Sequence, residues 1–262
     1  MRLPKHLPEY LMEAAGLGMF MISACVLGAI LEHPLSYVKQ AIPDPFARRA
    51  LMGLAMGATA VAIIFSPWGK RSGAHINPAV TLAYWQLGKI NTADAFGYVG
   101  GQFAGAVAGV GIAAMIVGPA LGDTSVNYVA TVPGRAGAGA AFVAEAAISF
   151  GLLLTVLFVS NSARLSKSTP WFAGALIALY ILFESPLSGM SMNPARTLGS
   201  AVFAREWAGL WIYFSAPPLG MSAAALFYRY RHGVERVLCA KLHHHNGARC
   251  VFNCNFGEIY NQ

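Results

Sequence analysis

The chain has 262 residues, of which 56% are hydrophobic and only 11% carry a formal charge. Soluble domains carry about 25% charged residues, so this composition excludes an ordinary soluble protein and indicates a membrane protein. A net charge of +7 would suggest a nucleic-acid partner in a soluble chain, but the topology described below accounts for it, and no nucleic-acid partner is expected.

Six apolar stretches are long enough to cross the ~30 Å hydrocarbon core of a bilayer, which takes about 20 helical residues. We predict spans near residues 10–31, 48–66, 95–118, 140–161, 171–187 and 207–230. Two further apolar segments begin at Asn77 and Asn193 and are too short to span. Each is predicted to be a half-helix, with Asn as its N-cap and Pro at its first helical position.

The half-helices belong to an internal repeat. Residues 77–82, NPAVTL, recur as residues 193–198, NPARTL, and Glu13 recurs as Glu145, each followed by two alanines. Each half contains three spans, so the second half must lie inverted relative to the first. Inverted repeats with interrupted helices place the functional site near the midplane, where the two halves meet.

The repeats predict a channel domain over residues 1–231, with repeat one at about 8–118 and repeat two at about 140–231, followed by a cytoplasmic tail over 232–262. Six spans place both termini on one side of the membrane. Twelve of the 18 basic residues fall on that side, namely Arg2, Lys5, Lys70, Arg71, Lys89, Arg164, Lys167, Arg229, Arg231, Arg236, Lys241 and Arg249. By the positive-inside rule, both termini are expected in the cytoplasm. The membrane is expected to be the plasma (inner) membrane.

The loops SGAHINPAVTL and GMSMNPARTLGSA resemble the two signature loops of the aquaporin (major intrinsic protein) family, and the resemblance extends over roughly residues 8–230. It implies an all-α membrane protein with an aquaporin-like inverted repeat of six transmembrane helices plus two half-helices. It also implies a homotetramer in the lipid bilayer with one pore per subunit. Such a protein is a passive channel rather than an enzyme, and it requires no cofactor.

The pore is predicted to pass both Asn-Pro-Ala triplets, whose residues are Asn77, Pro78, Ala79, Asn193, Pro194 and Ala195. If the halves are inverted, the positive N-terminal ends of the half-helices meet at the midplane and repel cations and protons. Both Asn amides can then donate to the oxygen of a passing water molecule. That water can donate only to its neighbours in the file, so it does not relay a proton.

Arg196 places a charge at membrane depth, which costs at least ~2.5–3.5 kcal/mol unless the side chain faces water or a partner. In the family, the matching arginine forms one wall of the outer constriction, and the register places Ile181 and Met190 beside it. The fourth position is Gly57 by straight counting back from Asn77. It becomes Met56 if the loop FSPWGKRSG carries one extra residue.

The sequence leaves the transported solute open. Strict water channels of the family place an aromatic residue and a histidine in the filter, and their absence here favours a more apolar and wider constriction. In contrast, Thr197, Ala201 and the pair Tyr213-Phe214 resemble the water-conducting branch. We predict passage of water with other small neutral solutes. The alternative is a wider facilitator of glycerol, urea, ammonia or metalloid acids, with water secondary.

Four further polar positions lie in the predicted spans or, for His75, in the loop before the first half-helix. By the resemblance, Glu13 and Glu145 accept hydrogen bonds from the loops that lead to the half-helices. A proton relay, as in a coupled transporter, is the alternative role. His75 is expected at the inner mouth, with a purely structural histidine as the alternative. For Glu184, three roles stay open: bracing the second loop, lining a vestibule, or pairing locally.

The tail contains three of the four cysteines, Cys239, Cys250 and Cys254, together with the histidines 243–245; the fourth, Cys25, is expected to pack inside the first span. Cys239 and His243 are four residues apart, as are Cys250 and Cys254, so each pair would share one face of a helix. These four residues predict a tetrahedral zinc site, with the neighbouring histidines 244 and 245 as substitutes for His243. An ordered tail of this kind is expected to cross the inner mouth. The alternative is a disordered basic tail with incidental cysteines.

Overall fold

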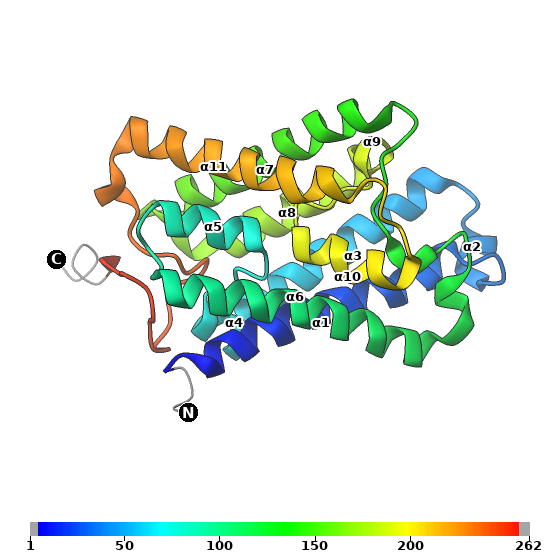
Figure 1. Ribbon diagram of the computed structural model, residues 1–262, viewed down its shortest axis with the longest axis horizontal. Helices are drawn as coiled ribbons and strands as arrows, with labels where there is room; N and C mark the ends of the chain where they lie inside the picture. The colour runs from blue at the N-terminus through cyan, green and yellow to red at the C-terminus, as the bar shows by residue number, and fades with distance from the viewer. Residues whose placement is uncertain (1–4, 257–262) are drawn as a thin grey trace.

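The computed structural model describes residues 5–256, which form a bundle of long helices lying side by side (Figure 1). The long helices are α1 (Leu7–Glu32), α3 (Pro45–Phe65), α6 (Thr92–Val117), α7 (Gly137–Ser160), α8 (Thr169–Phe183) and α11 (Leu210–His232). The shorter helices are α2 (Tyr37–Ala41), α4 (Pro67–Ser72), α5 (Pro78–Gln86), α9 (Ser185–Ser188) and α10 (Pro194–Ala204). The connections include the 3-10 turns η1 (Gly118–Gly122), η2 (Asn127–Val129), η3 (Ser166–Ser168) and η4 (Val234–Arg236). Residues 5–256 contain no strand, so the predicted all-α class is confirmed.

Within the described residues, five helices are long and apolar enough to cross a membrane: α1, α3, α6, α7 and α11. The remaining predicted span, 171–187, is divided into α8, which has 15 residues, and the single turn α9. Pro186 explains the break, because it has no N–H to donate to the preceding turn, and it is tolerated only in the first turn of a helix, which is its place in α9. The helix on that side of the bundle is therefore interrupted at Glu184.

The two halves of the chain pack in the same way. Helix α1 lies along α6, and α7 lies along α11, while α3 and α8 pair between the halves. A Cβ atom on Gly105 would lie 2.1 Å from the carbonyl oxygen of Ala14, and one on Gly220 would lie 2.2 Å from that of Ala146. Ala14 and Ala146 occupy the same place in the two repeats. Glycine is therefore required at both crossings, since any side chain would push the helices apart.

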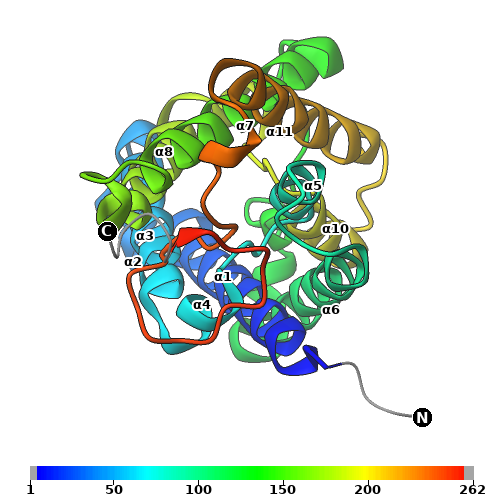
Figure 2. The same ribbon diagram turned by 90° about the vertical axis from the view of Figure 1, so that its left-hand side faces the viewer.

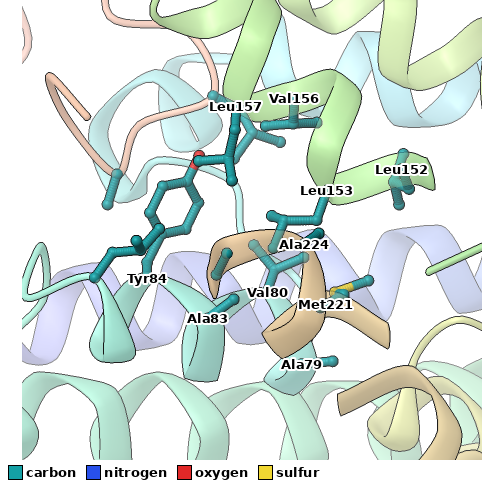
Figure 3. Close-up of a cluster of buried hydrophobic side chains, with 14 of the residues drawn as sticks. Ala79, Val80, Ala83, Tyr84, Leu152, Leu153, Val156, Leu157, Met221 and Ala224 are labelled. Carbon is teal, nitrogen blue, oxygen red and sulfur yellow. The ribbon is translucent and has the colours of Figure 1, made fainter. Parts of the chain in front are cut away.

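The half-helices α5 and α10 point at each other from opposite ends of the bundle (Figure 1). Each packs against a long helix of the other repeat, α5 against α11 and α10 against α6. Figure 3 shows this exchange for α5: Tyr84 lies beside Leu157 of α7, and Val80 lies near Leu153 of α7 and Ala224 of α11. The hydrophobic core thus fixes the position of a half-helix from repeat one by side chains from repeat two.

The described chain begins and ends at the same end of the bundle, which we call the terminal end. Residues 233–256 leave α11 there and cross the middle of that end toward α4 and α1 (Figure 2). We refer to these residues as the tail segment.

Candidate functional site

The N-termini of the two half-helices meet through a reciprocal pair of side-chain contacts. Asn77 caps α5 by accepting from the N–H of Ala79 at 2.9 Å, and its amide nitrogen donates to the carbonyl oxygen of Met192 at 2.7 Å. Asn193 caps α10 in the same way, and its amide donates to the carbonyl oxygen of Ile76 at 2.8 Å. An amide carries two N–H donors, so one donor of each asparagine has no partner within residues 5–256.

The loops that lead to these caps share an unusual backbone. Each contains three residues with positive φ at matching places: Gly73 (95°), Ala74 (56°), Ile76 (40°), Gly189 (80°), Met190 (52°) and Met192 (53°). Positive φ is uncommon for residues other than glycine and persists only where the surroundings hold the backbone in place. The sequence signals one glycine in each loop, but it does not show that the non-glycine residues share this conformation.

Two buried carboxylates hold these loops. Glu13 accepts from the Ser72 hydroxyl at 2.7 Å, and it also accepts from the N–H groups of His75 and Ile76 at 3.1 and 2.5 Å. The amide of Gln102 adds a fourth bond to Glu13 at 2.8 Å. The sequence repeat does not signal Gln102, because this polar side chain of α6 has no counterpart in repeat two.

Glu145 makes the equivalent contacts in the second half. It accepts from the Ser188 hydroxyl at 2.7 Å, and from the N–H groups of Ser191 and Met192 at 2.6 and 2.7 Å. Both carboxylates are fully buried. Glu184 differs, since its two carboxylate oxygens are buried and have no hydrogen-bond partner within the described residues.

A central cavity of about 280 Å³ runs past the meeting point of the half-helices. Asn77, Asn193 and Arg196 are part of its wall, as are Ile181 and Met190. The Nη1 atom of Arg196 is buried without a hydrogen-bond partner in residues 5–256. An unpaired guanidinium nitrogen beside a cavity is a binding group for a small polar molecule, because buried polar groups need partners.

The predicted filter residue Gly57 is not part of the cavity wall and lies in the contact between α3 and α8, whereas the alternative, Met56, lines the cavity. A Cβ atom on Gly57 would lie 2.5 Å from the carbonyl oxygen of Gly174. The residue that faces the cavity is therefore Met56, which corresponds to one extra residue in the connecting loop. Gly57 instead allows the two helices to approach closely.

Substitutions at the two adjacent residues Met56 and Gly57 test which of them lines the cavity. We expect Met56→Ala to enlarge the cavity and raise the permeability to glycerol and urea while the protein remains folded. Gly57→Ala should instead destabilise the helix contact by about 1–3 kcal/mol, since it overpacks a close approach. Stopped-flow solute uptake and thermal unfolding in detergent measure the two effects. Raised uptake by Gly57→Ala, with no change in Met56→Ala, would contradict this assignment.

His75 lies at the terminal end of the cavity and is 2% exposed. Its Nδ1 is 3.1 Å from the Thr81 hydroxyl, and its Nε2 lies 2.9 Å from the carbonyl oxygen of Ala240 in the tail segment. A carbonyl only accepts, so Nε2 carries the proton and donates it. Both ring nitrogens are thus engaged by the protein.

The tail segment brings together four potential metal ligands. The ligand atoms of Cys239, His244, Cys250 and Cys254 all lie within 4.8 Å of one another. The predicted ligand His243 is not part of this group; its ring packs edge-on against Phe65 at 5.0 Å. The expectation failed for His243 because the segment is irregular rather than helical, so residues four apart do not share a face.

Comparison with known proteins identifies a family whose sequences resemble this chain over most of its length. A family model described as "Major intrinsic protein" matches residues 2–228. Mouse aquaporin-4 is 36% identical over 183 residues, which are 69% of this chain and 55% of the relative. The probable aquaporin NIP7-1 of Arabidopsis thaliana is 31% identical over 223 residues, covering 85% of this chain and 76% of the relative.

The chain thus spans about half the length of the mouse relative. Among solved structures, the aquaglyceroporin from Plasmodium falciparum superposes with a TM-score of 0.68 at 21% identity. The superposition covers 86% of this chain and 96% of that structure. At this identity the match supports the fold.

Proposed function

Because the chain belongs to the major intrinsic protein family, we propose that its central cavity is a passive pathway for water and other small neutral solutes across a membrane. The observation that carries this proposal is the pair Asn77 and Asn193, each with one unpartnered amide donor at the cavity wall. The N-terminal ends of α5 and α10 add partial positive charge at the same point.

These groups suit water and oppose the passage of cations and protons. A water oxygen that accepts from both asparagines has its hydrogens directed along the pore. That orientation prevents it from accepting a proton from its neighbour. Arg196 adds a full positive charge to the wall of the same cavity, so a cation meets a second repulsive site. Neutral solutes are repelled neither by the half-helix N-termini nor by Arg196.

The expected solute range follows from the residues beside Arg196. Met56, Ile181 and Met190 line the cavity with apolar side chains and offer no side-chain hydrogen-bond donor. A constriction with apolar side chains and one guanidinium lacks the aromatic residue and the histidine of a strict water filter, and therefore resembles the filters of channels that also pass larger solutes. We therefore propose water together with solutes of the size of glycerol or urea. The alternative function is a facilitator of such solutes for which water is secondary, and the same apolar residues would form its constriction.

Ile181→His tests whether the apolar character of the constriction determines which solutes pass. The imidazole adds a donor and acceptor to an apolar wall, so we expect glycerol and urea uptake to fall while water permeability is retained. Ile181→Leu, which keeps both volume and polarity, is the matched control. Stopped-flow light scattering of proteoliposomes measures both quantities. If the parent already excludes these solutes, the filter is not the apolar wall described here.

The same measurement tests the channel function itself. Parent proteoliposomes should shrink faster than empty liposomes under an osmotic gradient, with a low activation energy and no dependence on a proton or sodium gradient. Uptake that requires such a gradient would indicate a coupled transporter. Water permeability equal to that of empty liposomes, together with no uptake of glycerol, urea or ammonia, would contradict the proposal.

We also propose a homotetramer in the plasma (inner) membrane with both termini in the cytoplasm. The basic residues of the terminal end, such as Lys70, Arg71 and Arg229, support this orientation through the positive-inside rule. Permeation in this proposal requires no cofactor. The residues that suit a metal ion belong to the tail segment, and none of the four is part of the cavity wall.

A further inference from the structure

Residues 237–243 of the tail segment are buried although they form no regular secondary structure. Seven consecutive residues are buried, namely Val237, Leu238, Cys239, Ala240, Lys241, Leu242 and His243. Backbone groups in such a stretch need partners from elsewhere in the protein. The N–H of Leu238 donates to the Asn161 side chain at 2.7 Å, and that of Asn253 donates to the carbonyl oxygen of Lys89 at 3.0 Å. The tail segment is thus bonded to two of the connections at the terminal end of the bundle.

The tail segment also covers the mouth of the cavity. His75 donates to the carbonyl oxygen of Ala240 at 2.9 Å, and the N–H of Leu242 donates to that of Gly73 at 3.1 Å. The side chain of Leu242 forms part of the cavity wall. The ring of Phe252 stacks on His75 with centroids 5.3 Å apart. Figure 2 shows the segment crossing the centre of this end of the bundle.

The four ligand atoms of the tail segment lie close enough together to reach one tetrahedral ion after small adjustments, all within 4.8 Å of one another. The sulfur atoms of Cys239 and Cys250 are 3.5 Å apart, and His244 Nε2 is 3.0 Å from the sulfur of Cys254. Zinc bonds of ~2.3 Å to sulfur and ~2.0 Å to nitrogen place neighbouring ligands about 3.5–3.8 Å apart. Three thiolates with one imidazole form a donor set that zinc prefers, and the compact spacing favours a single ion over an iron–sulfur cluster.

The charge of Lys241 provides an independent indication. This lysine is 2% exposed, and its ammonium donates to the carbonyl oxygens of Ala248 and Arg249, both at 3.0 Å. None of the ion pairs within the described residues includes it. A buried cation needs a nearby anion. Zinc with three thiolates and a neutral imidazole carries one net negative charge, and the backbone N–H of Lys241 already points at the sulfur of Cys239, 3.5 Å away.

We propose that Cys239, His244, Cys250 and Cys254 bind one Zn²⁺ ion, which holds the tail segment across the terminal mouth of the cavity and partly closes the pore there, so that flux is reduced but not abolished. Binding releases the three thiol protons and joins two parts of the segment that have no regular structure to hold them together. Loss of zinc releases this constraint, so Ala240 and Leu242 leave the cavity mouth. The closure rests on the proposed channel function, whereas the metal site does not.

The metal site is tested by elemental analysis of the full chain, purified without a histidine tag or metal resin. We expect about one zinc per chain in the parent, since the site has a complete set of four ligands. Cys250→Ser combined with Cys254→Ser should lose nearly all of it. Cys25→Ser is the matched control, because Cys25 is buried in α1 away from the cluster, and it should keep the zinc. Zinc near zero in the parent, or a Cys239–Cys250 disulfide in its place, overturns the proposal.

The closure is tested by water flux before and after a membrane-permeant zinc chelator. Flux through the parent should rise on chelation, while the double serine variant should be fast from the start and unresponsive. Phe252→Ala separates closure from metal binding: it should keep its zinc and still conduct faster than the parent, because the stack on His75 is lost. Bound zinc with a flux that neither chelation nor Phe252→Ala changes overturns the closure.

A failure of the channel function itself is distinguishable. In that case neither the parent nor any variant conducts a solute, but amide hydrogen exchange over residues 237–242 still reports on the tail. Strong protection in the parent that is lost on chelation supports a tail fastened by zinc. Protection that is absent in the parent, or unchanged by chelation, overturns it.

Discussion

Glu13→Leu should prevent the accumulation of folded protein in the membrane. The carboxylate accepts four hydrogen bonds, from the Ser72 hydroxyl, from two backbone N–H groups and from the Gln102 amide. Each buried donor left without a partner costs about 1–3 kcal/mol, so four of them approach the 5–15 kcal/mol that stabilises a typical protein. Fluorescence-detected size exclusion of the solubilised protein measures the loss of the folded peak.

Glu13→Gln provides a graded comparison that keeps the shape of the side chain. One carboxylate oxygen becomes an N–H₂ group, which cannot accept from the N–H of Ile76. We expect a loss of about 1–3 kcal/mol, which for a protein of this size lowers the melting temperature by roughly 2–12 °C. Glu235→Gln, at an exposed position in the tail segment, is the matched control and should change little. Equal stability of both glutamine variants would show that Glu13 does not hold the loop.

The parts of the fold that repeat in the sequence could be predicted from it. Two copies of Asn-Pro-Ala, each behind a short glycine-containing loop, indicated paired half-helices, and the structure forms α5 and α10 at those residues. The family and the all-α architecture are confirmed. An Asn N-cap followed by Pro determines where each of these helices begins, and this pair of residues occurs in both halves of the chain.

The parts that could not be predicted depend on contacts between distant residues. The choice between Met56 and Gly57 depends on how α3 packs against α8, and no sequence periodicity records that contact. The break between α8 and α9 was marked by Pro186, although the apolar run obscured it. In the tail segment, His244, which the sequence offered only as a substitute for His243, joins the cysteines, because tertiary hydrogen bonds and not a helix fix the backbone there.

Arg196→Val should make the pore leak cations and admit more glycerol and urea. Its guanidinium is part of the cavity wall, and Nη1 has no partner among the described residues, so the side chain places a full positive charge at the wall. A unit charge 4 Å from a passing cation opposes it by about 4 kcal/mol at an effective dielectric constant near 20. Where this site is the highest barrier, cation flux rises by about three orders of magnitude, since each ~1.36 kcal/mol is a factor of ten.

The comparison with Arg196→Lys separates charge from shape. Lysine keeps the positive charge but loses the planar fork of donors, so cations should stay excluded while glycerol and urea selectivity changes. Proton leak should rise less than cation leak in Arg196→Val, because the N-termini of α5 and α10 and the amides of Asn77 and Asn193 are unaffected. Planar-bilayer conductance measures the cation leak, and a pH-sensitive dye inside proteoliposomes measures the proton leak. Leaks in the valine variant identical to those of the parent would place the filter elsewhere. A proton leak as large as the cation leak would show that Arg196, rather than the half-helix termini, excludes protons.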